Sequence, residues 1–296
     1  MALLINHNLM ASNAARNLAG AYNALSKSVR KLSSGLRVGT AADDAAGLAV
    51  AELMRANVAV LNQGVRNAND AISLVQTADG ALAVIDEKLI RMKELAEQGS
   101  TGTYTTAQRL VIDSEYQAMA SEITRIANST DFNGIYLLNG NLSSDTHSGS
   151  ALQPTGKLLV HFGTSNDSKE DYYYVQIETS TAAAFGVGNS STQDAGYAVS
   201  TQAAAQDALD AVDAAIVSKD RIRASLGAVQ TRLEGTVTNL QVQAENLAGA
   251  QAQITDVDVS TEMTEFVRQQ IIAQSATAML AQANVMPRLA LQLLGI

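Results

Sequence analysis

In this chain of 296 residues, 47% are hydrophobic but only 4% are aromatic and none is tryptophan, so a thick globular core built on aromatic rings is not expected. The net charge is −9 and no cluster of lysine and arginine occurs, which argues against nucleic-acid binding. The absence of cysteine excludes disulfides and thiolate metal sites.

The N-terminal region predicts an amphipathic helix. Its apolar and small residues recur in alternating steps of three and four, as in a heptad pattern: Ala11, Ala14, Leu18, Ala21, Leu25, Ser28 and Leu32. The sequence Ser33-Ser34-Gly35 predicts the end of this helix, because glycine tolerates the left-handed conformation of a C-terminal cap. Residues 1–20 lack a basic segment followed by a continuous apolar core, so no conventional signal peptide is expected.

A second, much longer helix is predicted from about Ala45 to Gln98. Asp43 and Asp44 precede it and are interpreted as caps that complement its dipole, not as a metal pair. After a break at residues 99–102, a third helix is predicted, and Asn133-Gly134 and Asn139-Gly140 are turn signals of the hairpin type. The apolar face of this third helix carries Ile112, Tyr116, Met119, Ile123 and Ile126.

Residues 141–197 differ in composition from the rest of the chain, because they are richer in Ser, Thr, Gly and Tyr. Within them, Lys157–Phe162 and Tyr172–Glu178 alternate with the period of two that predicts strands. Helical heptads return from Leu209 to Leu247. A last helix follows the polar segment Thr255–Asp258, with a stripe made of Ile272, Ala276, Met279, Ala283, Met286, Ala290 and Leu293.

The predicted fold is therefore mainly α: a long antiparallel helical hairpin of the coiled-coil or bundle type with a small β-hairpin insert. Residues 1–42 and 256–296 are expected to form a terminal coiled-coil domain. Residues 43–140 and 198–255 are expected to form a helical rod domain that carries the insert 141–197. The terminal stripes are rich in alanine, so both end helices are expected to be largely disordered in the free monomer and to order when copies assemble.

Membrane insertion and catalysis find little support in the sequence. The apolar stretch Gln269–Pro287 is interrupted by Gln, Ser, Thr and Asn, which indicates an amphipathic helix and not a membrane span. The three histidines His7, His147 and His161 are far apart, no HExxH motif occurs, and no GxSxG turn accompanies the serines. We therefore expect no enzyme activity and no cofactor. Met10, Met279 and Met286 are interpreted as residues of helix seams and not as a binding groove.

Long motifs at both ends of the chain point to a family. Leu32–Leu82 closely resembles the N-terminal signature of bacterial flagellins. Glu245–Met263 and the closing segment Met279–Gly295 resemble their C-terminal signature. Motifs of this length and order are highly specific. By this resemblance the chain is identified as a member of the flagellin family, of a short type that has the inner domains only.

The resemblance implies a structural subunit that polymerises into the extracellular flagellar filament for swimming motility. It also implies the family's partners: further copies of the chain, a chaperone that holds the C-terminal helix, the flagellar type III export apparatus, and the hook-associated and cap proteins. In flagellins the terminal helices form the innermost layer of the filament. The candidate assembly residues are therefore Leu18, Leu25, Leu32, Ile272, Met279, Met286 and Leu293.

A second surface resembles the flagellin segment that vertebrate Toll-like receptor 5 recognises. Arg91, Leu95 and Gln98 match the recognised pattern, and Glu115 on the following helix matches its partner. The same residues are equally compatible with an ordinary rod surface that makes contacts between subunits.

Two other functions remain open at this point. A hook–filament junction protein would share the N-terminal signature and the helical ends. A soluble coiled-coil adaptor would explain the heptads but not the terminal motifs.

Overall fold

The computed structural model describes residues 8–144, 156–167, 170–188 and 198–293, with only the backbone for residues 287–293. The described chain is mainly helical, and the prediction of a mainly α fold with a small β-hairpin insert is confirmed. The helices are α1 (Leu9–Ser34), α2 (Ala45–Ser100), α3 (Thr106–Ser129), α4 (Ala182–Phe185), α5 (Gln202–Thr255) and α6 (Val259–Leu293). The strands are β1 (Asp131–Phe132), β2 (Ile135–Tyr136), β3 (Leu158–His161) and β4 (Tyr172–Val175).

Helix ends fall where the capping chemistry places them. Gly35 ends α1 in the left-handed conformation with a φ of 73°, as the sequence predicts. Asp44 caps α2, because its Oδ1 accepts a hydrogen bond of 2.9 Å from the backbone N–H of Gly47. Asp43 has another role, since its carboxylate accepts hydrogen bonds from the hydroxyl and the backbone N–H of Thr40 and so holds the loop before α2.

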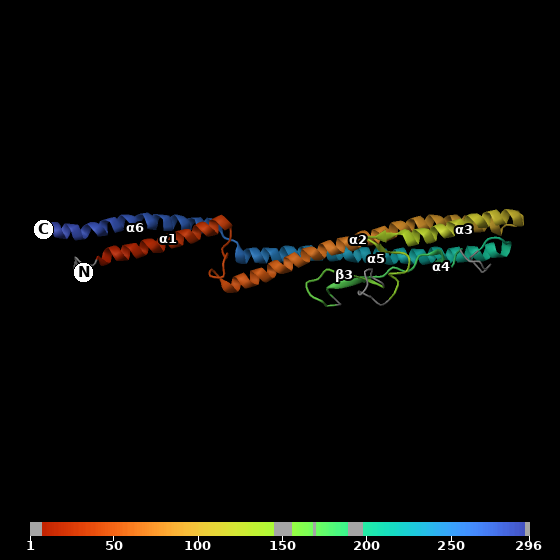
Figure 1. The fold of residues 1–296 in the computed structure, drawn as a ribbon, viewed down its shortest axis with the longest axis horizontal. Coiled ribbons are helices and arrows are strands. Elements are labelled where there is room, and N and C mark those ends of the chain that lie inside the picture. The colour runs from red at the N-terminus through yellow and green to blue at the C-terminus, as the bar shows by residue number, and fades with distance from the viewer. Residues whose placement is uncertain (1–7, 145–155, 168–169, 189–197, 294–296) are drawn as a thin grey trace. The chain divides into compact units, whose positions relative to one another are not determined.

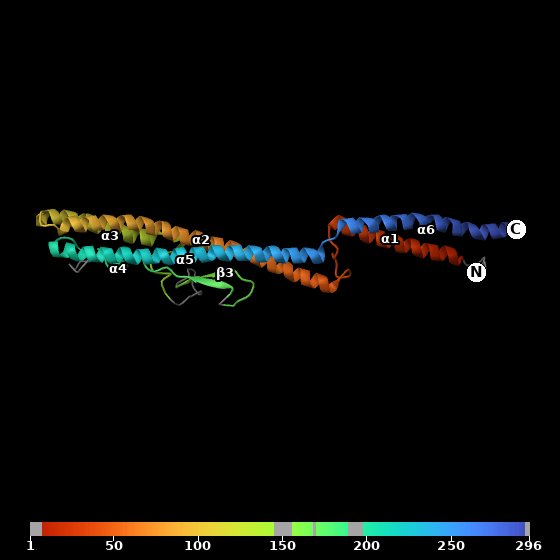
Figure 2. The same ribbon diagram turned by 180° about the vertical axis from the view of Figure 1, so that it is seen from behind.

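The chain forms two compact units. One comprises residues 1–58 and 245–296, and the other comprises residues 59–244. In the first unit, α1 and α6 pair along their length, as both Figure 1 and Figure 2 show. In the second unit, the parts of α2 and α5 that belong to it run antiparallel, since residues that rise in number along α2 meet residues that fall in number along α5.

The core of the second unit follows the predicted heptads. The seam of α2 is buried at Val75, Ala78, Leu82, Ile85, Leu89, Met92 and Ala96. Helix α3 adds Ile112, Tyr116, Ile123 and Ile126 to this core, whereas Met119 is only half-buried. Burial and the nearby charge of Asp113 raise the pKa of the Tyr116 phenol, which therefore stays neutral in the core.

The insert packs on α2 as a small antiparallel hairpin. Strands β3 and β4 pair with Leu158 opposite Val175 and His161 opposite Tyr172, and β3 lies beside α5 in Figures 1 and 2. The close approach requires a glycine, because a Cβ at Gly64 of α2 would lie 2.1 Å from the carbonyl oxygen of Phe162. The side-chain amide of Asn67 also donates a hydrogen bond of 2.8 Å to the carbonyl oxygen of His161.

The two Asn-Gly sequences form different kinds of turn. Asn133 and Gly134 connect β1 to β2 with φ angles of 50° and 80°, so they form the tight hairpin turn that the sequence predicts. Asn139-Gly140 forms a turn without a strand pair in the described residues. Here the Oδ1 of Asn139 accepts a hydrogen bond from the backbone N–H of Asn141.

Candidate functional site: the paired terminal helices and their linkers

Helices α1 and α6 pair in an antiparallel manner from one end to the other. Asn8, the cap of α1, donates a side-chain hydrogen bond of 2.8 Å to the carbonyl oxygen of Ala283. At the opposite end of α1, Lys31 Nζ lies 3.5 Å from a carboxylate oxygen of Glu262. These two contacts fix the direction and the register of the pair.

The fully buried positions of the seam between the two helices are occupied by small residues. On α1 the seam follows the predicted stripe, since Ala21 and Ser28 are buried and Leu18, Leu25 and Leu32 are half-buried. On α6 the most buried positions are Ala273 and Ala283. Side chains of this size bury little apolar area, so the pair by itself gains little hydrophobic stabilisation.

Of the predicted C-terminal stripe, Ala276 and Ala283 lie in this seam, whereas its large residues Ile272, Met279 and Met286 lie outside it. Met279 is 62% exposed, and Ile272 and Met286 are exposed as well. Met10, Met279 and Met286 are exposed, so they are not part of the α1–α6 seam within the subunit, and their interpretation as residues of helix seams stays a prediction for the assembled state. The seam of α6 instead runs one position away, through Glu262, Phe266, Gln269, Ala273, Ala276, Leu280 and Ala283. The side chain of Leu293 lies outside the described side chains.

Both helices consequently carry an uncovered apolar stripe in addition to the seam. On α1, Tyr22 and Val29 are exposed and lie one heptad apart. On α6, the exposed apolar residues are Val259, Met263, Val267, Ile271, Ile272, Met279, Val285 and Met286. Tyr22 and Val29 on α1, and Ile272, Met279 and Met286 on α6, recur one heptad apart without a covering helix, and such exposed apolar residues mark a candidate interaction surface.

The two linkers next to this pair are joined to each other. Arg37, in the linker that follows α1, donates from its backbone N–H to the carbonyl oxygen of Thr255 at 2.6 Å. In return, Val257 donates from its backbone N–H to the carbonyl oxygen of Gly35 at 2.9 Å. These bonds form the isolated antiparallel bridge between Leu36 and Asp256.

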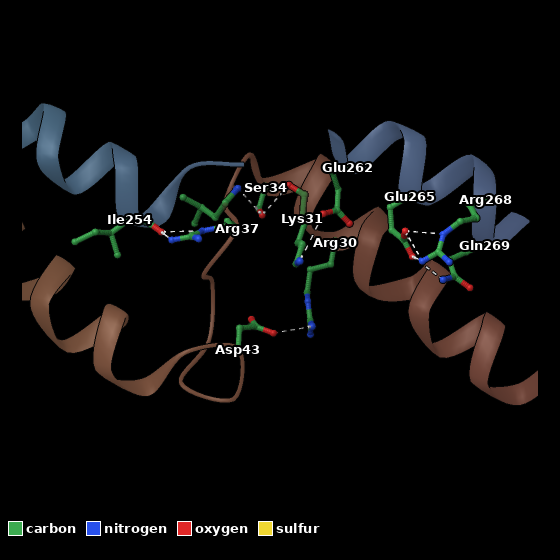
Figure 3. Close-up of polar contacts among 11 residues, drawn as sticks. Arg30, Lys31, Ser34, Arg37, Asp43, Ile254, Glu262, Glu265, Arg268 and Gln269 are labelled. Atoms are coloured by element: carbon green, nitrogen blue, oxygen red, sulfur yellow. Dashed lines mark hydrogen bonds and ion pairs between the residues drawn. The ribbon is translucent and has the colours of Figure 1, made fainter. Parts of the chain in front are cut away.

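The guanidinium of Arg37 adds a further contact beside this bridge. As Figure 3 shows, it reaches the end of α5 and donates from Nη2 to the carbonyl oxygen of Ile254 at 2.7 Å. The last carbonyl groups of a helix have no partner within the helix, so this donor, brought from another segment, caps α5 and places a positive charge at the negative end of its dipole. No local pattern predicts this contact, since the two residues are 217 positions apart.

Carboxylates hold the start of α6. Asp258 Oδ1 accepts hydrogen bonds from the backbone N–H groups of Ser260 and Thr261, and Oδ2 accepts one from the Thr261 hydroxyl. These bonds, that of the Thr261 hydroxyl first, lower the pKa of Asp258 from its ordinary value of 3.8. Two turns later, hydrogen bonds from Gln269 and Arg268 lower the pKa of Glu265 (Figure 3).

The candidate receptor surface lies on α2 and α3 of the second unit. Arg91, Gln98 and Glu115 are exposed, and Arg91 Nη2 lies 2.7 Å from Glu115 Oε1. Hydrogen bonds to Glu94 and Glu115 raise the pKa of the Arg91 guanidinium. Leu95 is only 1% exposed, so it supports this surface from the core and is not part of its outer face.

The described residues contain no cluster of three or more metal-ligating side chains, and none of the described helices is both long and apolar enough to cross a membrane. Of the three histidines, His161 lies in β3 as predicted, and His7 and His147 lie outside the described residues.

Comparisons with known proteins agree on one group. The bacterial flagellin N-terminal helical region matches residues 5–143, and the bacterial flagellin C-terminal helical region matches residues 209–294. The chain is 39% identical over 292 residues to a flagellar filament 33 kDa core protein of Treponema phagedenis, covering 99% of this chain and 100% of the relative. It is 41% identical over 292 residues to a flagellin of Halalkalibacterium halodurans, with the same coverage. A crystal structure of Bacillus cereus flagellin is 28% identical with a TM-score of 0.46, covering 63% of this chain and 94% of that chain.

Proposed function

The chain belongs to the bacterial flagellin family, and from this premise we infer that it is a structural subunit that polymerises into the flagellar filament, outside the cell, and not an enzyme. The matched relatives are named as flagellins or as filament core proteins, and nothing favours the hook-associated alternative.

One observation supports a specific assembly surface. The apolar stripes of α1 and α6 are exposed in the subunit, although their spacing suits burial against further helices. We propose that copies of the chain cover these stripes in the filament, with Tyr22 and Val29 on α1 and Ile272, Met279 and Met286 on α6 as contact residues. Leu18, Leu25 and Leu32 then hold α1 against α6 within each subunit, and Leu293 extends the C-terminal surface.

Assembly is coupled to ordering of the ends in this proposal. The fully buried positions of the α1–α6 seam are alanine and serine and its larger residues are only half-buried, so the seam supplies too little apolar burial to offset the cost of ordering two helices in a free monomer. Burial of the exposed stripes by neighbouring copies adds the missing apolar area. A terminal pair that orders on assembly also suits passage of an unfolded chain through a narrow export channel.

Polymerisation trials with matched variants test this assembly surface. Met279→Gln places an amide on the exposed stripe and should reduce filament yield, observed by electron microscopy, while the urea midpoint of the monomer stays unchanged. Gln274→Ala, at another exposed position of α6, should assemble as the unmodified chain does. Hydrogen exchange should find residues 8–32 and 262–286 protected in filaments but not in monomers. Normal filaments from Met279→Gln, or strong protection of both ends in the monomer, would refute the assembly surface or the coupled ordering, respectively.

The same C-terminal stripe is the proposed binding surface of a flagellin export chaperone before the chain enters the flagellar type III export apparatus. Hook-associated and cap proteins are proposed to contact the terminal helices at the ends of the filament. A truncated chain tests the part of the C-terminal end in assembly. The chain that lacks residues 289–296 should keep a folded second unit but lose polymerisation. If the truncated chain polymerises normally, these residues have no part in assembly.

Receptor recognition is a separate proposal for the α2–α3 surface. Arg91 and Glu115 are proposed to contact Toll-like receptor 5 in the monomer, supported by their exposure and their mutual ion pair. Arg91→Ala and Glu115→Ala should each reduce the signal of a receptor reporter cell line. Arg125→Ala is the matched control, because it removes another exposed ion pair, with Glu122, from α3. Equal signals from all variants would exclude this surface.

A further inference from the structure

A buried lysine interrupts the apolar seam between α2 and α5. Lys219 occupies a core heptad position of α5, between the buried residues Ala215 and Ile222. Its side chain is only 3% exposed. A charged group in such a seam requires a partner, because an unpaired buried charge is strongly unfavourable.

The partners of Lys219 lie on both helices. Its Nζ is 2.5 Å from Asp86 Oδ1 on α2 and 2.7 Å from Asp220 Oδ1 on α5. Burial acts to lower the pKa of Lys219, but the carboxylates of Asp220 and Asp86 outweigh this effect and raise it, so the ammonium group stays charged.

Two more ion pairs join the same helices on either side of this one. Arg223 Nε lies 2.7 Å from Asp79 Oδ1, and Lys93 Nζ lies 2.5 Å from Asp213 Oδ1. We refer to the three contacts between the helices as the register pairs: Asp79–Arg223, Asp86–Lys219 and Lys93–Asp213. Their α2 members are spaced one heptad apart and have charges of minus, minus and plus.

We propose that the register pairs select the one alignment of α5 against α2 in which every charge meets its opposite. The apolar seam alone discriminates weakly, because aliphatic and alanine residues repeat every heptad on both helices and a slip of seven residues restores an apolar seam. The charges do not repeat in this way.

A slip of one heptad in either direction brings like charges together. If α5 moves so that Lys219 faces Asp79, Asp213 comes to face Asp86, and two carboxylates meet. In the opposite slip, Lys219 faces Lys93, and a buried ammonium meets a second cation. Specificity of helix pairing arises from such repulsion in the wrong alignments as much as from attraction in the right one.

This proposal predicts that swapping the two charges within one register pair removes the preference for the native alignment, although every ion pair is kept. In the double variant Lys93→Asp with Asp213→Lys, the native alignment keeps all three ion pairs. All α2 members are then negative and all α5 members positive. The carboxylate–carboxylate and ammonium–ammonium encounters therefore disappear from both slipped alignments, which become accessible.

Distance measurements between spin labels test this prediction. The chain has no cysteine, so labels can be placed at Gln76→Cys on α2 and Val217→Cys on α5, which are both exposed and are offset from each other along the helix axis. A slip of seven residues displaces the labels by about 10 Å along the helix axis. After refolding from denaturant, the labelled chain with unmodified register pairs should give one narrow distribution of distances between the labels. The exchanged variant should give additional populations.

A matched exchange elsewhere provides the control. Arg221→Glu with Glu178→Arg reverses an exposed ion pair that joins α5 to a residue outside α2, so a single distance should remain. One unchanged distance in the variant with Lys93→Asp and Asp213→Lys would overturn the proposal and leave register selection to apolar packing. Failure of that variant to refold with the helical circular dichroism of the unmodified chain would also overturn it, since the pairs would then hold the fold and not select its register.

Discussion

Replacing Gly64 with alanine should destabilise the chain, although alanine is the better helix former. An added Cβ would lie 2.1 Å from the carbonyl oxygen of Phe162, whereas ordinary contacts begin near 3.4 Å, so the insert must move by roughly 1 Å. Such overpacking costs about 1–3 kcal/mol. The movement also strains the hydrogen bond from Asn67 to the carbonyl oxygen of His161, which is worth about 1 kcal/mol.

The gain in helix propensity on replacing glycine with alanine is about 1 kcal/mol, so the net effect of Gly64→Ala is a loss of about 1–3 kcal/mol. Gly80→Ala is the matched control on the same helix, because Gly80 is exposed and a Cβ there meets nothing within 4 Å. This control should therefore gain about 1 kcal/mol.

Urea denaturation followed by circular dichroism measures both changes, and they should have opposite signs. Hydrogen exchange should locate the damage of Gly64→Ala in β3 and β4 and leave the α2–α5 seam protected. If Gly64→Ala is as stable as Gly80→Ala, the insert does not pack closely on α2 and the reasoning is refuted.

Three further changes test other parts of the molecule. Leu82→Ala removes a fully buried side chain and should lower the free energy of unfolding, measured by urea titration, by about 2–5 kcal/mol. Val84→Ala, at an exposed position of the same helix, should change this free energy little, and equal effects of the two variants would show that Leu82 is not in the core. The folded-state pKa of Asp258 lies below its ordinary value of 3.8, so its cap is fully present above that pH and is lost as the pH falls through the lowered pKa. The protection factors of the Ser260 and Thr261 amides, taken relative to the intrinsic exchange rate at each pH, should therefore fall in acid for the unmodified chain but stay constant over this range in Asp258→Asn. Arg37→Ala should increase hydrogen exchange at residues 254–257. Arg37→Lys should restore protection only in part, because lysine keeps the charge but lacks the two guanidinium donors that reach Ile254. Full protection in Arg37→Ala would show that the backbone bridge alone holds the linkers together.

Much of the fold was predictable because its signals are local. The heptad stripe of α1, the glycine cap at Gly35, the long helix that begins at Ala45 and the two strands of the insert each follow from neighbouring residues. Side-chain spacing alone distinguishes a period of 3.6 from a period of 2, and capping chemistry fixes where helices start and stop. Family membership was likewise predictable, because long motifs lie in the same terminal helices.

The choice between adjacent faces of one helix required the tertiary structure. On α6, Met279 and Leu280 lie on neighbouring stripes of similar apolar character, and the sequence predicted the stripe of Met279 as the seam. Leu95 likewise fits a surface motif by its sequence but is buried by the packing of α2. Which stripe is covered depends on the shape of the partner helix, and a pattern within one helix contains no information about its partner.

By itself, therefore, the sequence determined the helices, the hairpin insert and the family of this protein, since each depends on residues close together in the chain. Only the tertiary structure decided which contacts join distant segments, such as Arg37 with Ile254 and Asp86 with Lys219. These contacts span more than a hundred residues, and each depends on a helix register that many similar heptads would allow. The physical reason is that local propensity fixes the elements, whereas specific charges and the shape of the neighbouring surface fix their alignment.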